Sequence, residues 1–222
     1  MAEVTLSQDA FTRNNRAAAE NRQLFEQYGV LVINLMSSPG AGKTSLLQKT
    51  IEALGDRYRI GVIQGDLATQ IDADRVRARG AQAVQINTHG VCHLEAHMVN
   101  KVLPQLDLDE LDLLFIENVG NLICPSGYDL GEHHRITVLS VPEGNDKILK
   151  YPVMFLRTEL VLLNKIDVLP YFDFDVARAV EDLRAINPRS RLIPVSAKEG
   201  TNLDEWYRWI DEVYARRSRA AG

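Results

Sequence analysis

Short apolar runs alternate with longer stretches of mixed polar and apolar residues along most of the chain. Seven of these runs are rich in Val, Ile and Leu and end at polar residues or glycine, as is typical of strands buried on both faces of a sheet. The predicted strands span 30–36, 59–66, 83–87, 111–117, 135–141, 160–165 and 191–196.

The stretches between these strands carry apolar residues at helical spacing. The predicted helical segments are 7–28 (ending at Gly29), 44–54, 72–80, 94–105, 146–155, 173–186 and 203–217. Strands that alternate with amphipathic helices imply an α/β fold with a mostly parallel central sheet of about seven strands, flanked by helices. We therefore expect one domain over residues 30–222, preceded by an N-terminal helical extension over residues 1–29.

A phosphate-binding loop follows the first predicted strand. Residues 37–44 read SSPGAGKT, which matches the P-loop pattern except that Ser37 stands where the first Gly belongs. Glycines let backbone N–H groups approach phosphate, the lysine reaches the β- and γ-phosphates, and the threonine ligates Mg²⁺. The alternative is a glycine-rich turn with no ligand. The predicted phosphate-binding residues are Gly40, Ala41, Gly42, Lys43, Thr44 and Ser45.

Acidic residues follow the next strands of the predicted sheet. Asp66 ends the second strand, Glu117 ends the fourth, and Asp72 lies in the segment after the second. Carboxylates at these strand ends hold Mg²⁺ or orient the attacking water in P-loop enzymes, although each could instead be a helix cap or a solvated side chain. We predict Lys43 and these three acids as catalytic, with Thr44, Asp66 and Glu117 as magnesium ligands.

Two further strand ends indicate which base is bound. Residues 164–167 read NKID, and residues 196–198 read SAK. The Asp167 carboxylate can accept two hydrogen bonds from guanine N1–H and N2–H₂, a donor pattern that adenine lacks. We expect Asn164 to address the base edge, Lys165 to cover the ring or hold the P-loop, and Ser196 with the Ala197 N–H to complete the pocket. Together with the P-loop, these motifs predict binding of GTP and GDP.

Composition excludes other classes of function. The net charge of −5 gives no reason to expect nucleic-acid binding, which usually needs a basic face. No apolar run reaches the roughly 18 residues of a membrane span, and the N-terminus lacks the pattern of a signal peptide. We expect a cytoplasmic protein whose cysteines stay reduced.

The segment 88–97, THGVCHLEAH, holds three of the five histidines and one of the two cysteines. Cys92 and His93 follow the third predicted strand and Cys124 follows the fourth, so the three can meet at one sheet edge and bind Ni²⁺ or Zn²⁺. A two-fold dimer could complete the coordination. Alternatively, the cysteines are small buried apolar residues. Four histidines are assigned to no site: His89, His97, His133 and His134.

Between residues 30 and 197 the chain resembles the hydrogenase-maturation GTPases called HypB. The resemblance rests on SSPGAGKT, GDLATQIDADR, THGVCHLEAH, FIENVGNLICP, GNDKILKYP and NKID. It implies a SIMIBI-class GTPase that dimerises around nucleotide, holds its metal at the subunit interface and helps to insert nickel into the [NiFe]-hydrogenase large subunit. Lys147 is then expected to reach the partner's nucleotide.

The resemblance also implies binding partners, and it limits the number of metal sites to expect. The partners would be the nickel-binding accessory protein HypA and the hydrogenase large-subunit precursor. Some relatives carry an N-terminal cysteine motif or histidine-rich segment, whereas residues 1–29 contain neither residue type, so only the GTPase-domain metal site is expected here.

One loop, residues 117–124, joins the predicted magnesium ligand Glu117 to the predicted metal ligand Cys124. A γ-phosphate that pulls on this loop would shift Cys124, as switch loops do. The leading interpretation is thus a slow GTPase whose nucleotide state sets metal affinity. The alternatives are a scaffold for which GTP is a structural ligand, and a urease-type accessory GTPase, which the Cys92-His93 and Cys124-Pro125 pattern disfavours.

Overall fold

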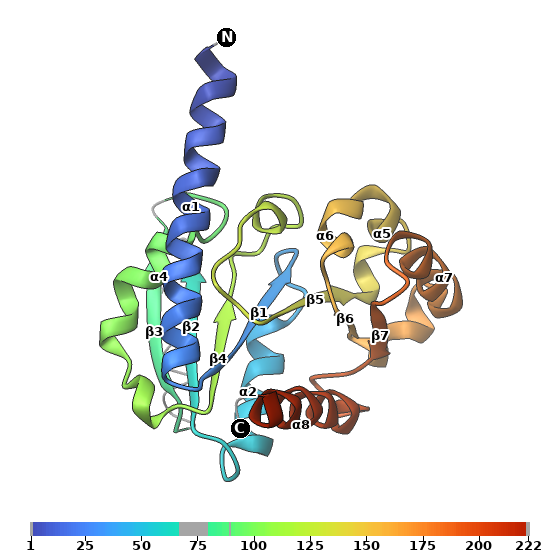
Figure 1. The fold of residues 1–222 in the computed structure, drawn as a ribbon. Coiled ribbons are helices and arrows are strands. Elements are labelled where there is room, and N and C mark those ends of the chain that lie inside the picture. Colours follow the sequence, from blue (N-terminus) through green and yellow to red (C-terminus); the bar gives the residue numbers. More distant parts are fainter. Residues whose placement is uncertain (1, 67–79, 89, 221–222) are drawn as a thin grey trace.

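A computed structural model describes residues 2–66, 80–88 and 90–220. Its centre is a seven-stranded sheet in which every pairing is parallel, with the strand order β3-β2-β4-β1-β5-β6-β7 (Figure 1). The strands are β1 (Leu31–Ser37), β2 (Ile60–Asp66), β3 (Gln82–Asn87), β4 (Leu113–Glu117), β5 (His134–Ser140), β6 (Leu160–Asn164) and β7 (Arg191–Pro194). The predicted α/β fold is confirmed.

Helices cover both faces of the sheet. The α-helices are α1 (Ala2–Gln27), α2 (Lys43–Leu54), α4 (Ala96–Val102), α5 (Lys147–Lys150), α6 (Pro152–Leu156), α7 (Val176–Ile186) and α8 (Leu203–Ala220). Short 3₁₀ helices are η1 (Leu103–Gln105), η2 (Leu108–Glu110), η3 (Cys124–Gly127), η4 (Val141–Glu143) and η5 (Ile166–Tyr171). The helix predicted over 72–80 lies outside the described residues.

Successive side chains of β1 point to opposite faces of the sheet, so they belong to different hydrophobic clusters. Leu31, Ile33 and Leu35 pack with α2 and α8 in one cluster, which includes the fully buried Trp206. Val32 faces the opposite side, where α1 and α4 pack over β2, β3 and β4. A third cluster lies beneath α5, α6 and α7. Strands buried on both faces explain why the apolar runs are nearly continuous.

Most helix boundaries agree with the sequence, and the differences have local causes. The helix predicted over 146–155 is two helices, because Pro152 lacks an N–H and begins α6. Asp175 caps α7 through a 3.1 Å hydrogen bond from the Arg178 N–H. Helix α1 begins at Ala2 rather than at residue 7, and it ends before Gly29, which has a φ of +69°.

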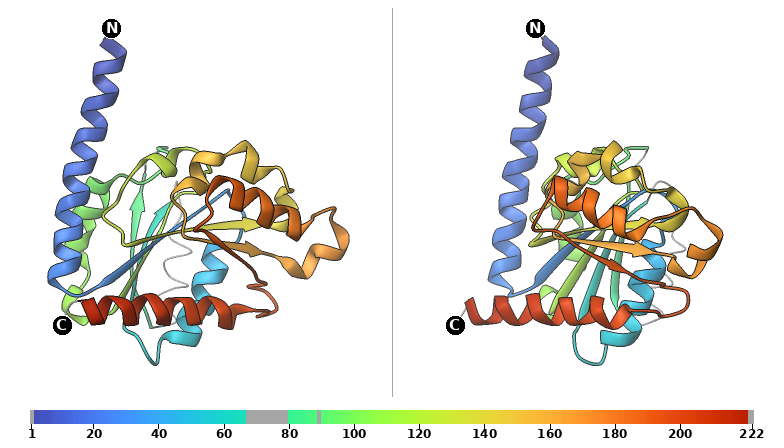
Figure 2. Two further views of the ribbon diagram at one scale, coloured as in Figure 1. Left: turned by 45° about the vertical axis from the view of Figure 1, so that its right-hand side comes forward. Right: turned by 90° about the vertical axis from the view of Figure 1, so that its right-hand side faces the viewer.

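Helix α1 is not detached from the domain. Its C-terminal part lies along α4, and its N-terminal part projects past the carboxyl edge of the sheet (Figure 2). Its last turn meets α8, where Arg217 Nη2 donates to the Phe25 carbonyl at 3.1 Å. The extension predicted over residues 1–29 is therefore packed against the body of the protein along much of its length.

Candidate functional site

The P-loop connects β1 to α2. Lys43 is the first residue of α2 and is buried, and its Nζ donates to Ser37 Oγ at 2.6 Å. The serine that replaces the first glycine of the motif thus provides an acceptor for the lysine. Burial lowers the pKa of Lys43, while the carboxylates of Glu117 and Glu143 oppose this shift.

The NKID segment holds the P-loop from the side. Asn164 Nδ2 donates to the Ala41 carbonyl at 2.9 Å, and Lys165 Nζ donates to the Gly40 carbonyl at 2.7 Å. Lys165 was predicted either to cover the base ring or to hold the P-loop, and this contact corresponds to the second role. Gly42 has a φ of +100°, and a Cβ there would lie 2.4 Å from Asn164 Nδ2, so glycine is required at this contact.

The SAK segment joins the same group. Asn164 Oδ1 accepts from the Ala197 N–H at 3.0 Å, and Asp167 Oδ1 accepts from Ser196 Oγ at 2.7 Å. Asn164 and Ala197 are therefore hydrogen-bonded to each other. This contact was not predicted from the sequence, which suggested only that each group faces the base. A cavity of about 310 Å³ lies between this group and the start of α2, lined in part by Gly42, Ser45, Asn164, Lys165, Ala197 and Lys198.

The Glu117 side chain lies against the P-loop. Its Oε1 accepts from Thr44 Oγ1 at 2.7 Å, and its Oε2 accepts from Gln64 Nε2 at 2.6 Å. Thr44 and Glu117, two of the three predicted magnesium ligands, are thus in contact at the sheet edge. Asp66 ends β2 opposite Asn87, which places its backbone at the same edge, whereas Asp72 lies outside the described residues.

Glu143 is a P-loop contact that sequence reasoning missed. It closes a capping box with Ser140 at the end of β5, and it also accepts a hydrogen bond from Ser38 Oγ of the P-loop. The sequence does carry a sign of this residue: Ser140 and Glu143 form the Ser-x-x-Glu pattern of a capping box at the end of a strand.

The predicted metal ligands come together at the same edge. Cys92 Sγ and Cys124 Sγ are 3.0 Å apart, and Cys92 Sγ lies 3.9 Å from His93 Nδ1. The ligand atoms of Cys92, His93 and Cys124 all lie within 4.8 Å of one another. Two thiols and an imidazole at this spacing fit Ni²⁺ or Zn²⁺. The hydrogen bond between the Cys92 and Cys124 thiols, followed by partial burial, raises the pKa of the Cys124 thiol.

The His93 ring is held on two sides. It stacks on Tyr128 with a centroid separation of 4.1 Å, and its Nε2 lies 3.6 Å from Glu95 Oε1. Burial lowers the pKa of His93, and Glu95 opposes the shift. A carboxylate on one imidazole nitrogen leaves the other, which faces Cys92, available to a metal. Glu95 and Tyr128 were not predicted, although Glu95 lies between two histidines of the sequence.

The other histidines differ in position. His97 Nδ1 lies 3.3 Å from Glu95 Oε2, and 62% of the His97 side chain is exposed. His133 Nδ1 accepts from the Val32 N–H at 2.9 Å, and His134 Nδ1 lies 2.7 Å from Glu159 Oε2, so both are engaged at the start of β5. His89 lies outside the described residues.

Lys147 begins the four-residue helix α5, with its Nζ 5.5 Å from the centre of the Tyr151 ring. Among the described helices, none is long and apolar enough to cross a membrane.

Comparison with known proteins defines the class. Residues 31–194 match the family model "CobW/HypB/UreG, nucleotide-binding domain", which makes the chain a P-loop GTPase of that class. The hydrogenase maturation factor HypB of Azotobacter vinelandii is 54% identical to it over 98% of this chain and 72% of its own length. The chain therefore belongs to the HypB family, a family of nickel-binding GTPases that act as hydrogenase maturation factors.

Solved structures of the family agree with this assignment. The crystal structure of HypB from Helicobacter pylori in complex with nickel has a TM-score of 0.88 and 40% identity, covering 92% of this chain and 96% of that one. HypB from Archaeoglobus fulgidus has a TM-score of 0.86 and 38% identity, covering 91% of this chain and 99% of that one.

Proposed function

We propose that this chain hydrolyses GTP slowly and uses its nucleotide state to control a nickel site that forms between two copies of the chain. One observation carries the proposal: the thiols of Cys92 and Cys124 lie 3.0 Å apart, at the end of the loop that begins at Glu117. The other end of that loop is bonded to Thr44 of the P-loop. The nucleotide and metal sites thus share one segment.

The proposed reaction is GTP + H₂O → GDP + phosphate. Lys43 binds the β- and γ-phosphates, the carboxylate of Asp167 selects guanine, and Asp66 and Asp72 supply charge near the attacking water. Thr44, Asp66 and Glu117 would hold Mg²⁺, which would supply positive charge to balance the charge on the phosphates. Slow intrinsic turnover is expected because the P-loop, the NKID segment and residues 117–124 contribute no arginine.

Nickel is the proposed cargo, with zinc as a competitor for the same ligands. Three ligand side chains from one chain leave a four-coordinate metal short, and Cys124 of a second copy is the proposed completion. Dimerisation would then be required for metal binding, since neither copy alone supplies all four ligands. Lys147, two residues before the exposed Leu149 on α5, is the proposed contact with the partner's nucleotide.

The path from nucleotide to metal is argued from two contacts of residues 117–124. Gly120 lies directly against the P-loop, since a Cβ at Gly120 would be 2.9 Å from Pro39 Cα. Asn118 is buried, and its Oδ1 accepts from the Leu94 N–H at 3.1 Å, one residue beyond His93. A movement of the P-loop against Gly120 would therefore be passed to both metal-bearing segments.

The partners and the setting follow from the same chemistry. We propose a nickel-binding accessory protein as the donor and the [NiFe]-hydrogenase large-subunit precursor as the acceptor. Two thiols 3.0 Å apart stay available to a metal only under reducing conditions, which supports a cytoplasmic location.

The test is nickel binding by Cys92→Ala and Cys124→Ala, measured by equilibrium dialysis with GDP and with a non-hydrolysable GTP analogue. Both variants should lose nickel in both states. His97→Ala is the matched control, because His97 lies four residues beyond His93 but is exposed. Unchanged nickel binding by Cys124→Ala in both nucleotide states would overturn the proposed metal site. Single-turnover phosphate release separates a working GTPase from a scaffold in which GTP is only a structural ligand.

A further inference from the structure

We propose that helix α1 is a positioning element for the metal site: it joins the segment that carries His93 to the segment that carries Cys124, and it fixes the His93 ring. The inference rests on the proposed metal binding, but it concerns residues outside the ligand set. It assigns a chemical role to the N-terminal helix.

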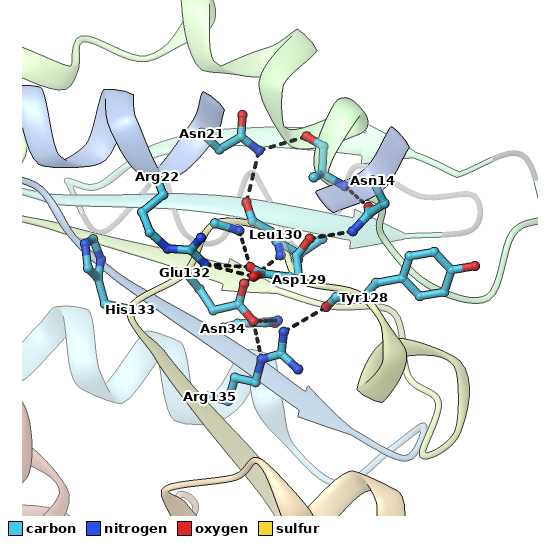
Figure 3. Close-up of polar contacts among 12 residues, drawn as sticks. Asn14, Asn21, Arg22, Asn34, Tyr128, Asp129, Leu130, Glu132, His133 and Arg135 are labelled. Carbon is cyan, nitrogen blue, oxygen red and sulfur yellow. Dashed lines mark hydrogen bonds and ion pairs between the residues drawn. The ribbon is translucent and has the colours of Figure 1, made fainter. Parts of the chain in front are cut away.

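Two asparagines on α1 hold the two metal-bearing segments together. Asn14 is 2% exposed; its Oδ1 accepts from the Ala96 N–H at 2.8 Å, and its Nδ2 donates to the Asp129 carbonyl at 2.8 Å. Ala96 lies three residues beyond His93, and Asp129 lies five residues beyond Cys124. A single buried side chain of α1 therefore bridges both segments (Figure 3).

The second asparagine repeats the bridge seven residues further along the same helix. Asn21 is fully buried, and its Nδ2 donates to the Ala96 carbonyl at 2.9 Å and to the Leu130 carbonyl at 3.0 Å. Residues seven apart lie on one face of a helix. This face of α1 thus pairs with the same two segments at two levels, and the backbone groups it satisfies are costly to leave unpaired.

Close packing and charge support the bridge. A Cβ at Gly131 would lie 2.7 Å from the Ala18 carbonyl oxygen, so the segment after Cys124 rests directly on the backbone of α1. Arg22 Nη2 contacts both oxygens of Asp129 at 2.8 and 2.9 Å. From beneath, Arg135 of β5 donates to the Tyr128 carbonyl at 3.1 Å (Figure 3). The segment is therefore held between α1 and the sheet.

A column of three rings extends this contact to a metal ligand. The Phe11 ring of α1 stacks on Tyr128 with centroids 5.3 Å apart, and Tyr128 stacks on His93 with centroids 4.1 Å apart; both pairs are 29° from coplanar. Stacked rings restrict rotation of the imidazole. Because partners that orient a metal ligand typically change metal affinity by roughly 10- to 100-fold, α1 can affect the metal without touching it.

The experiment titrates the full-length variants with Ni²⁺ alone, following the thiolate-to-nickel absorption and the affinity against a competing chelator. Asn14→Ala should bind nickel about tenfold more weakly, with a shifted absorption band. Asn15→Ala is the matched control, since Asn15 is the exposed neighbour on the same helix. Tyr128→Ala should likewise weaken binding and shift the band, whereas Tyr128→Phe, which keeps the ring, should restore both.

The outcomes are distinguishable from failure of the proposed function. If Cys92→Ala and Cys124→Ala bind nickel as the unchanged protein does, the metal site itself is wrong. If those two variants lose nickel while Asn14→Ala and Tyr128→Ala keep the affinity and spectrum of the unchanged protein, only the role of α1 is overturned. Thermal unfolding and GDP affinity accompany each variant; should Asn14→Ala fail to fold, the Tyr128→Ala and Tyr128→Phe pair decides.

Discussion

Gly42 meets two independent demands, one from its backbone and one from its neighbour. Its φ of +100° disfavours any L side chain, and a Cβ there would come within 2.4 Å of Asn164 Nδ2. We predict that Gly42→Ala lowers GDP affinity by at least about tenfold, because Asn164 must leave its bond to the Ala41 carbonyl for the new methyl group. Isothermal titration with GDP measures this effect.

Gly40 is the control for that substitution. Its φ is +74°, but a Cβ there meets no protein atom within 4 Å, so Gly40→Ala carries a backbone strain of about 1 kcal/mol without a clash with Asn164. An equal loss of GDP affinity in the two variants would show that strain, and not the contact with Asn164, explains the requirement at Gly42.

For individual residues, the sequence predicted which side chains lie in the site better than it predicted the contacts that they make. The P-loop lysine and the Cys92, His93 and Cys124 cluster follow from residue types placed at strand ends. The bond between Lys43 and Ser37, and the one between Asn164 and Ala197, do not, because each joins atoms whose proximity depends on the packed fold. The contact of Glu143 with Ser38 was missed for the same reason, although its capping box with Ser140 has a local Ser-x-x-Glu signal.

The loop from Glu117 to Cys124 is the element on which the proposed coupling depends. Gly120 has no left-handed backbone, so an alanine is permitted there by conformation, but its Cβ would meet Pro39 Cα at 2.9 Å. We predict that Gly120→Ala moves the loop off the P-loop and removes most of the difference in nickel affinity between the GDP and GTP-analogue states. Nickel titration in each state measures that difference.

Gly127 is the matched control on the same segment. A Cβ at Gly127 meets only the Phe11 ring, at 3.7 Å, which is ordinary contact. Gly127→Ala should therefore keep the nucleotide dependence of nickel binding. Retention of the full dependence by Gly120→Ala would refute the contact with Pro39 as the path.

Elements with strong periodicity were predicted within a few residues, and proline and tertiary contacts caused the differences. Pro152 divides a predicted helix into α5 and α6, and the start of α1 was placed five residues too late. The packing of α1 was not predictable from its own sequence. Its buried face carries Asn14 and Asn21, which read as polar surface until their partners on α4 and the 129–130 segment are known.

Across the whole molecule, His133 connects three distant parts of the chain. It follows the 128–132 segment, its ring faces Glu26 of α1, Arg217 of α8 and the neighbouring His134, and burial followed by Arg217 lowers its pKa to about 4. Below its ordinary pKa of 6.5, the unfolded chain binds a proton that the folded protein does not. The free energy of unfolding should therefore fall as the pH decreases from about 6.5 to about 4.

The size of this effect is about 1–3 kcal/mol across that window. His133→Asn, which keeps an acceptor for the Val32 N–H but cannot titrate, should show a flatter pH dependence in urea unfolding. His97→Asn, at an exposed position, should follow the unchanged protein. Identical pH dependence in the His133→Asn variant and the unchanged protein would show that another group carries the acid sensitivity.

The central claim is that nucleotide state controls the metal site through assembly of two copies. The most direct measurement is nickel affinity together with molar mass, for protein loaded with GDP and with a non-hydrolysable GTP analogue. We predict a dimer with the GTP analogue, a monomer with GDP, and different nickel affinities in the two states. Equal mass and equal affinity in both states would contradict the claim and leave a GTPase with a passive metal site.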